Sequence, residues 1–326
     1  MKYFRFNRLP ALLFAVLLMG GCAQEDDKVI LRLGHTLDTQ HTVHKAMEFM
    51  AQRLEEYSHG QMEIRIYPSG QLGSERQMVE LLQIGSLAMT KVSASPLEGF
   101  VPEMKIFSIP YVFRDREHFW KVLNSDIGKQ LLAGVESVRL KGMAYYDAGS
   151  RSFYTTDGPV RSPADLKGKK IRVLNSPTAV KTVQALGAAA TPVAWGELYT
   201  ALQQGVVDGA ENNPPSYYLS RHYEISRYYS LDEHTSVPDV VLMSLPVWNS
   251  LTPQQQDWLS KAMADSVEYQ KSLWQQASDD ALKAVEAAGV EVIYPDKQPF
   301  RDAVAPFHAS LAGTEVGKLI EKIKDM

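Results

Sequence analysis

The feature of this sequence that most constrains its fold is a stretch from Thr252 to about Ala288 without glycine, and without proline after Pro253. Thr252 and Gln255 form a capping box, with proline at the first helical position, so the stretch is predicted to be a single helix. About 36 residues at roughly 1.5 Å each give roughly 54 Å, which exceeds the diameter of a small domain. Such a helix either forms a coiled-coil arm or crosses two lobes and connects them. Because its apolar residues do not follow strict heptads, we favour the second arrangement.

Strand-like and helix-like segments alternate along the rest of the chain. In the first half, strands are predicted at 29–35, 62–68 and 87–95, with helices at 42–57 and 74–85. In the second half, strands are predicted at 141–149, 169–175, 190–195 and 206–213, with helices at 176–187 and 196–205. This alternation predicts an α/β fold with two units of comparable size.

The composition is that of a globular protein without an evident nucleic-acid surface. The chain has 326 residues, 45% of them hydrophobic and 22% charged, with a formal net charge of -4. This length suffices for two domains. There is no basic stripe with interleaved aromatic residues, so we expect no nucleic-acid partner.

Residues 1–22 resemble a secretory signal. Lys2, Arg5 and Arg8 precede an apolar run at 11–19 that is too short to span a bilayer unaided. The run is followed by Gly20, Gly21 and Cys22, the only cysteine of the chain, which excludes an intrachain disulfide.

The placement of Cys22 resembles a bacterial lipobox, in which the cysteine becomes the lipidated first residue. Met19 departs from the leucine usual at its position, and the alternative is a chance cysteine near an ordinary signal-peptidase site. We expect a periplasmic protein, anchored by a lipid if the lipobox is used, with 23–28 as a polar tether.

Signatures of common enzymes and metal sites are missing from the sequence. It contains no G-x-S-x-G, G-x-G-x-x-G, Walker A, HExxH or CxxC motif. His35, His41 and His44 lie close together, but no carboxylate or cysteine at a suitable spacing completes a ligand set. Asp208 and Glu211 form at most a weak acid–base pair. We therefore expect no catalytic residues, no cofactor and no metal.

The stretch "SPADLKGKKIRVLNS" places one arginine in a predicted strand. Ser162, Pro163 and Asp165 predict a short helix start, and Ile171-Arg172-Val173 a strand. Because side chains alternate along a strand, Arg172 points away from the face of its two apolar neighbours. By itself this pattern is typical of an arginine in water at a sheet edge.

Four stretches resemble one protein family over nearly the whole chain after the signal. They are "YPSGQLGSERQMVELLQIG", "YDAGSRSFYTT", "SPADLKGKKIRV" and "WGELYTALQQGVVDGAENN". They closely resemble the extracytoplasmic solute-binding subunit of TRAP transporters, the DctP-type family, and most of all its sugar-acid (uronate) branch.

The resemblance implies a two-lobed, type II periplasmic binding-protein fold whose lobes are joined by strands and a long helix that crosses both. Accordingly we expect residues 29–149 plus 238–270 to form lobe I. Residues 150–237 plus 271–326 are expected to form lobe II, with the connecting helix at about 252–288.

The resemblance also implies which residues bind the ligand. Arg172 is expected to pair with the ligand carboxylate, because a guanidinium matches its two oxygens. Arg151 is expected to face the same carboxylate, and Asn212 to bond it or a neighbouring hydroxyl. Further expected contributors are Trp195, Glu211, Asn213, Glu75, Ser93, His35 and His234. Trp195 alternatively belongs to the core, and Glu75 alternatively serves only as an acid at a helix start. Ser93 stands where some uronate binders carry asparagine.

The expected function is a periplasmic receptor that binds a hexuronate such as glucuronate or galacturonate and delivers it to a membrane permease. An aldonate, another hydroxy acid or a C4 dicarboxylate is the alternative ligand. A secreted enzyme acting on acidic sugars and a sensory module are the alternatives of other classes. We expect the protein to be a monomer.

Overall fold

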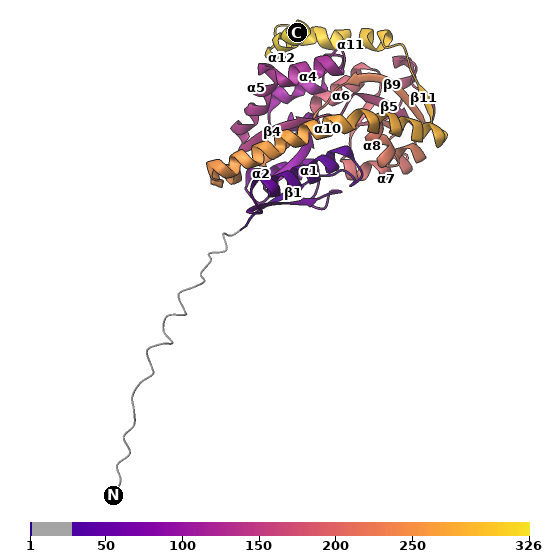
Figure 1. Cartoon of the computed structure of the whole chain (residues 1–326). Coiled ribbons are helices and arrows are strands. Elements are labelled where there is room, and N and C mark those ends of the chain that lie inside the picture. Colours follow the sequence, from indigo (N-terminus) through magenta and orange to yellow (C-terminus); the bar gives the residue numbers. More distant parts are fainter. Residues whose placement is uncertain (2–27) are drawn as a thin grey trace.

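The structure is a computed structural model that describes Met1 and residues 28–326. The predicted signal peptide, Cys22 and the tether up to residue 27 lie outside the described residues. The described chain contains two β-sheets, each covered by helices (Figure 1). We call the part built on the first sheet the first lobe, and the part built on the second sheet the second lobe.

The strands are β1 (Val29–Gly34), β2 (Met62–Tyr67), β3 (Met89–Ser93), β4 (Leu140–Tyr146), β5 (Arg151–Thr155), β6 (Lys170–Val173), β7 (Ala189–Pro192), β8 (Gly209–Asn212), β9 (Tyr228–Thr235), β10 (Asp239–Ser244) and β11 (Glu291–Ile293). The α-helices are α1 (Thr42–Tyr57), α2 (Glu75–Gln83), α3 (Ala94–Leu97), α4 (Arg116–Asn124), α5 (Asp126–Gly134), α6 (Pro177–Ala185), α7 (Leu198–Gln203), α8 (Pro214–Leu219), α9 (Leu245–Ser250), α10 (Pro253–Ala287), α11 (Gln298–Ser310) and α12 (Glu315–Lys324). Short 3-10 turns include η1 (Pro102–Ser108) and η4 (Trp195–Glu197). The helix predicted at 196–205 therefore begins as a 3-10 turn, and the strand predicted at 206–213 is shorter than expected.

The first sheet has the strand order β2-β1-β3-β10-β4. β1 runs parallel to β2 and β3, whereas β10 runs antiparallel to both β3 and β4. The strand predicted at 62–68 is confirmed as β2, and its residues Met62 and Ile64 are buried in a core cluster that also holds Met47 and Met50 of α1. β10 comes from the second half of the chain, so the first lobe is built from two separate segments.

The second sheet has the order β11-β9-β5-β8-β6-β7. β8 pairs antiparallel with β5 and parallel with β6. This topology places the ends of β5, β6 and β8 next to one another, and Arg151, Arg172 and Asn212 stand on these three strands.

The long helix predicted from the sequence is confirmed as α10, which has 35 residues. Its capping box between Thr252 and Gln255 is present. Figure 1 shows α10 in orange, running across the molecule past α1 and β4 at one end and past α8 at the other. It therefore joins the two lobes and is not a coiled-coil arm.

Two apolar residues of α12 bear on where the lobes divide. Ile320 and Ile323 pack in the same core cluster as Phe107 and Val240, which belong to the first lobe. The boundaries expected from the sequence remain a proposal, and we propose to count α12 with the first lobe although it follows 271.

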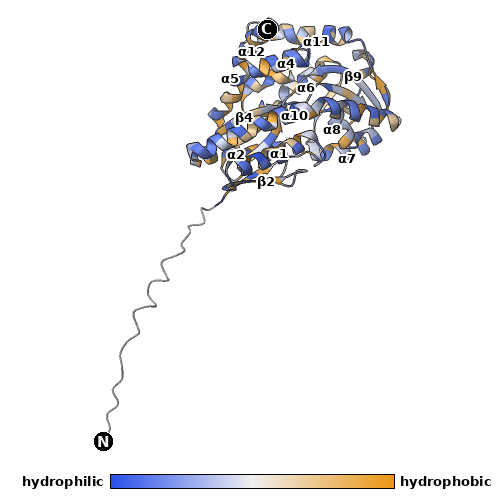
Figure 2. Cartoon of the chain, viewed as in Figure 1, coloured by the Kyte–Doolittle hydropathy of each residue, from blue (hydrophilic) through white to orange (hydrophobic). Residues whose placement is uncertain are grey.

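Figure 2 shows hydrophilic and hydrophobic residues side by side on most of the helices, as expected of helices with one face on a core. None of the helices within residues 28–326 is both long enough and apolar enough to cross a bilayer.

Candidate functional site

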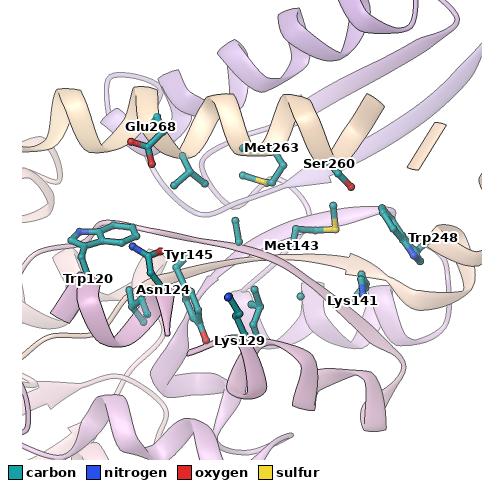
Figure 3. A pocket seen from close by; sticks show the side chains of 16 residues that line it. Trp120, Asn124, Lys129, Lys141, Met143, Tyr145, Trp248, Ser260, Met263 and Glu268 are labelled. Carbon is teal, nitrogen blue, oxygen red and sulfur yellow. The ribbon is translucent and has the colours of Figure 1, made fainter. Parts of the chain in front are cut away.

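Among the cavities formed by the described residues, a surface groove and an inter-lobe cleft are compared as candidate sites. The larger, with a volume of about 610 Å³, is a groove on the first lobe between β4, α10 and the α4–α5 pair. Figure 3 shows Ser260, Met263 and Glu268 of α10 on one side of this groove, with Met143 and Tyr145 of β4 facing them. The groove carries no buried charge that lacks a partner: Lys141, on its wall, is bound to Glu136 at 2.7 Å.

The second candidate lies between the lobes, where two cavities of about 240 and 30 Å³ share Glu75, Leu174 and Trp195 in their linings. The first contains Arg172, and the second contains Arg151 and Asn212. We call these joined cavities the cleft. The cleft is smaller than the groove, but its buried charged groups make it the better candidate for a ligand site.

Arg172 is held by the alternation of β6. Ile171 and Val173 are fully buried in the core cluster under α6, and Arg172 points to the opposite face. The interpretation as an arginine in water at a sheet edge is wrong, because β6 lies between β8 and β7 and Arg172 is only 1% exposed. The prediction that Arg172 lies away from its apolar neighbours is confirmed.

The guanidinium of Arg172 is buried, and no carboxylate of the described residues forms an ion pair with it. Nε donates to the carbonyl oxygen of Val193 at 2.9 Å, but Nη1 is buried and has no hydrogen-bond partner within residues 28–326. Burial lowers the pKa of Arg172, while the charge of Glu211 opposes that shift. An arginine stays protonated in proteins, so this is a desolvated cation with an unused donor. A bound anion would neutralise the buried charge and accept the hydrogen bond of the unused donor.

Trp195 lies beside this cation and also packs against two of the apolar core clusters. The guanidinium carbon of Arg172 is 5.8 Å from the centre of the indole ring, close enough for a cation–π contact. Trp195 is partly exposed and lines both cavities of the cleft. The ring therefore offers an apolar surface next to the charge.

Arg151, in contrast, is fully engaged by protein groups. It pairs with the carboxylate of Glu211 through Nε and Nη2, and Nη2 also donates to the Glu211 carbonyl oxygen at 2.6 Å. Nη1 donates to Oδ1 of Asn212 at 3.0 Å. Burial alone would lower the pKa of Arg151, but the carboxylate of Glu211 outweighs it and raises the pKa. Arg151 thus forms a rigid, neutralised unit that positions Asn212 at the cleft.

Glu211 lies behind Arg151 and is not paired with Asp208. Asp208 accepts from the backbone N–H of Lys170 at 2.7 Å. Glu211 is bonded to Arg151, and its Oε2 lies 3.9 Å from Nε2 of His234. The acid–base pair considered from the sequence is therefore not assembled.

His234 and Asn213 are both held by neighbouring groups. Nδ1 of His234 bonds Asp232 at 2.8 Å, and its ring stacks on Phe153. His234 lines a smaller cavity next to the cleft together with Arg151 and Glu211. Asn213 caps α8 through Oδ1 and donates Nδ2 to the carbonyl oxygen of Ala148, so its side chain is used although it borders the cleft.

His35 does not line the cleft. Its Nε2 bonds His44 at 2.9 Å, and its Nδ1 accepts from the backbone N–H of Leu37. His41 caps α1 and approaches Ser216 of the second lobe at 3.3 Å. In residues 28–326, no group of three or more His, Cys, Asp or Glu side chains is arranged to hold a metal ion. The role expected for His35 at the ligand thus has no support from its contacts.

On the first-lobe side of the cleft, Glu75 and Ser93 belong to a buried ionic cluster. Oε1 of Glu75 accepts from the backbone N–H of Ser93 at 3.0 Å and from Nζ of Lys91 at 3.3 Å. Lys91 also pairs with Oδ1 of Asp239 at 2.8 Å. Glu75 is the first residue of α2, as the alternative interpretation had it, and it also lines the cleft.

Lys91 and Asp239 were missed at the level of sequence. A lysine within the apolar stretch "LAMTKVSAS" was a signal, because lysine is rarely buried without a partner. Asp239 could not be assigned as that partner, since the pairing of β3 with β10 joins segments almost 150 residues apart. In the structure Asp239 stands directly opposite Ser93, and Val241 opposite Lys91.

The comparisons with known proteins now add to this geometry. The family model of the bacterial extracellular solute-binding proteins, family 7 (DctP), matches residues 33–314. The chain belongs to this family. Its members include the C4-dicarboxylate-binding periplasmic protein DctP of Rhodobacter capsulatus, 27% identical over 91% of each chain.

Solved structures agree with this assignment. A TRAP periplasmic solute-binding protein from Bradyrhizobium, in complex with D-galacturonate, is 43% identical with a TM-score of 0.88. The match covers 91% of this chain and 99% of that one. A second TRAP protein, from Pseudomonas putida F1 with bound D-glucuronate, is 36% identical, covers 91% of this chain and 97% of its own, and has a TM-score of 0.88. The chain therefore has the two-lobed fold of TRAP periplasmic solute-binding proteins, as the sequence predicted.

Proposed function

We propose that this family 7 solute-binding protein binds a hexuronate, such as glucuronate or galacturonate, in the cleft between its lobes. The observation that carries the proposal is Arg172, a cation that is 1% exposed and that, among the described residues 28–326, has no ion partner and no acceptor for one buried donor. A ligand carboxylate on Arg172 would supply the missing charge and acceptor. Pairing of this kind strengthens when closure lowers the effective dielectric.

The surroundings of Arg172 suit a sugar ring attached to that carboxylate. Trp195 offers an apolar face, Asn212 an amide, and Glu75 a carboxylate that can accept from hydroxyl groups. The two solved relatives described above hold D-galacturonate and D-glucuronate. Ser93, where some uronate binders carry asparagine, bonds Glu75 and Asp239, so its direct contribution to the ligand is smaller than that of its partners.

In the proposed mechanism the protein binds and releases its ligand without chemical change. The carboxylate docks on Arg172, Arg151 holds Asn212 beside it, and the lobes close over the ring. Closure is a shift between two populations, so the ligand must bind the closed form better than the open one. We further propose a periplasmic location, anchoring through Cys22 if it is lipidated, delivery to a TRAP permease, and a monomeric receptor.

A thermal-shift screen of the purified protein tests the ligand, after dialysis under mild denaturant to remove any co-purified acid. The panel contains hexuronates, aldonates, aldarates, C4 dicarboxylates, sialic acid and neutral sugars. A ligand at about one hundred times its dissociation constant adds about 2.7 kcal/mol to the free energy of unfolding, which raises the melting temperature by a few degrees. Shifts confined to uronates support the proposal. Shifts confined to aldonates or C4 acids would replace the ligand.

The alternative of an enzyme acting on acidic sugars is tested on the same sample. Incubation with a uronate followed by NMR of the sugar is expected to return it unchanged. A new sugar signal that requires the protein would contradict the binding role.

A further inference from the structure

The first-lobe side of the cleft carries an ionic cluster whose charges do not cancel. Lys91 pairs with Glu75 at 3.3 Å and with Asp239 at 2.8 Å. Ser93 Oγ is within 3.4 Å of the former carboxylate and 3.3 Å of the latter. We call Glu75, Lys91 and Asp239 the acidic wall, because two carboxylates face a single ammonium and leave a formal charge of -1.

Both carboxylates keep an oxygen for something other than the protein. All hydrogen bonds that they accept within residues 28–326 go to Oε1 of Glu75 and to Oδ1 of Asp239. Oε2 of Glu75 and Oδ2 of Asp239 accept no hydrogen bond within residues 28–326, and neither is fully shielded from solvent. Both residues line the cleft. Each therefore has an acceptor that a ligand can reach. Lys91 has three N–H donors, and its contacts with Glu75 and Asp239 use two of them.

The pairing of β3 with β10 fixes this wall. Asp239 stands opposite Ser93, so Asp239 and Lys91 lie on neighbouring strands, two residues apart in register, and their side chains share one face. Lys91 is 2% exposed and cannot swing into solvent. The acceptors are consequently held in place before a ligand arrives, which lowers the entropic cost of binding.

We infer that Asp239 and Glu75, held by Lys91, determine specificity: they select ligands that bear hydroxyl groups away from a single carboxylate, and they reject dicarboxylates. This inference rests on the proposed function. Hydroxyl groups donate to the free carboxylate oxygens in charge-assisted bonds. A second carboxylate at the same place would meet a wall of its own sign, and like charges brought together in an interface are strongly unfavourable. Arg172 and the acidic wall thus recognise different groups of one ligand, its carboxylate and its hydroxyls.

A purely structural cluster is the competing explanation, in which the three charges only hold β3 to β10. The two explanations differ in what removal of one negative charge does to the choice between ligands. D-glucuronate and D-glucarate serve as probes, because glucarate has the same configuration at carbons 2 to 5 but is open-chain and bears a second carboxylate at carbon 1.

The experiment measures dissociation constants of both probes by calorimetry for the wild type, Asp239→Asn and Glu75→Gln. Both substitutions keep the shape and remove one negative charge. We expect the wild type to prefer glucuronate, and each variant to bind glucuronate about 10-fold or more weakly. Binding of glucarate is expected to fall less or to rise, so the preference shrinks about 10-fold. Asp265→Asn is the matched control, because Asp265 pairs with Arg53 outside the cleft; its preference should not change.

The outcomes separate this inference from the proposed function. If the wild type binds no uronate, the proposed function fails. If it binds glucuronate but both variants weaken both probes by equal factors, or change neither, the acidic wall does not determine specificity. The melting temperature of each ligand-free variant shows whether it folds. Glu75 is the partly exposed member of the wall, so Glu75→Gln remains informative if Asp239→Asn unfolds.

Discussion

The two sides of the cleft handle buried charge in opposite ways. On the second-lobe side, Arg172 is a desolvated cation without an ion partner in the part of the chain that the structure describes, and Arg151 is neutralised by Glu211. On the first-lobe side, the charged groups are bonded to one another and keep a small negative excess. We propose from this difference that the second-lobe side is complete only with a ligand anion, whereas the first-lobe side is stable alone and supplies selectivity.

The largest expected effect comes from Arg172→Ala. Removal of one partner of a desolvated charge pair costs about 2–5 kcal/mol, which corresponds to roughly thirty- to several-thousand-fold weaker binding of a uronate. The ligand-free variant should be at least as stable as the wild type, because a buried cation without a partner is lost. Calorimetry and thermal melting measure the two quantities. Arg161→Ala is the control, since Arg161 is exposed and pairs with Glu291; uronate affinity equal to the wild type in Arg172→Ala would refute the assignment.

The next effect contrasts the two arginines. Arg151→Met leaves the carboxylate of Glu211 buried without its partner, so we expect a loss of about 3–5 kcal/mol in stability as well as weaker binding. The double variant Arg151→Met/Glu211→Gln should recover much of the stability and little of the affinity. Urea denaturation and calorimetry distinguish the two. An Arg151→Met protein as stable as the wild type would show that the buried carboxylate of Glu211 does not need Arg151, and would contradict the difference between the two arginines.

A smaller effect is expected where the lobes touch beside the cleft. Glu98 of the first lobe accepts hydrogen bonds from Ser176 Oγ, Thr178 Oγ1 and the backbone N–H of Thr178, at the start of α6 in the second lobe. These bonds join the lobes, so Glu98→Gln should favour opening and raise the rate of ligand release up to about 10-fold. Stopped-flow dissociation of the ligand measures this rate. Glu103→Gln, on the exposed side of η1, should leave it unchanged; identical release rates in both variants would exclude Glu98 from closure.

The smallest expected effect is the loss of stability at acidic pH that arises from buried histidines. Burial, together with the charge of Lys91, lowers the pKa of His35 and of His41 to about 3, and burial with the charge of Arg172 does the same for His222. In the unfolded chain these histidines take up a proton at about pH 6.5. The free energy of unfolding is therefore highest above pH 6.5 and falls as the pH drops from 6.5 toward 3. Between pH 8 and 6 the loss should be about 1 kcal/mol or less for each histidine. Urea denaturation at both pH values checks it, and His222→Gln should flatten the dependence; a stability that rises on acidification would contradict the sign.

Much of the fold could be predicted from the sequence, because local sequence patterns determine many of its helices and strands. The capping box and the absence of glycine specified α10, and the alternation around Ile171 placed Arg172 on the face away from the core. The burial of Arg172 could not be predicted locally, since it depends on β7 and β8 flanking β6. Family resemblance supplied the expectation that local pattern could not.

The site was predicted less completely, for a physical reason. Lys91 and Asp239 meet only because β10 returns to the first sheet, and no local signal announces that pairing. His35 was expected at the ligand from the family resemblance, yet its ring is hydrogen-bonded to His44.

We propose above all that the cleft recognises a sugar by its carboxylate. Calorimetric titration of the purified protein with D-glucuronate and with D-glucose tests this proposal, because glucose has a hydroxymethyl group where glucuronate has the carboxylate. We predict saturable binding of glucuronate with one site per chain and no measurable binding of glucose. Binding of glucose as tight as that of glucuronate would contradict the claim, because Arg172 would then have no part in recognition.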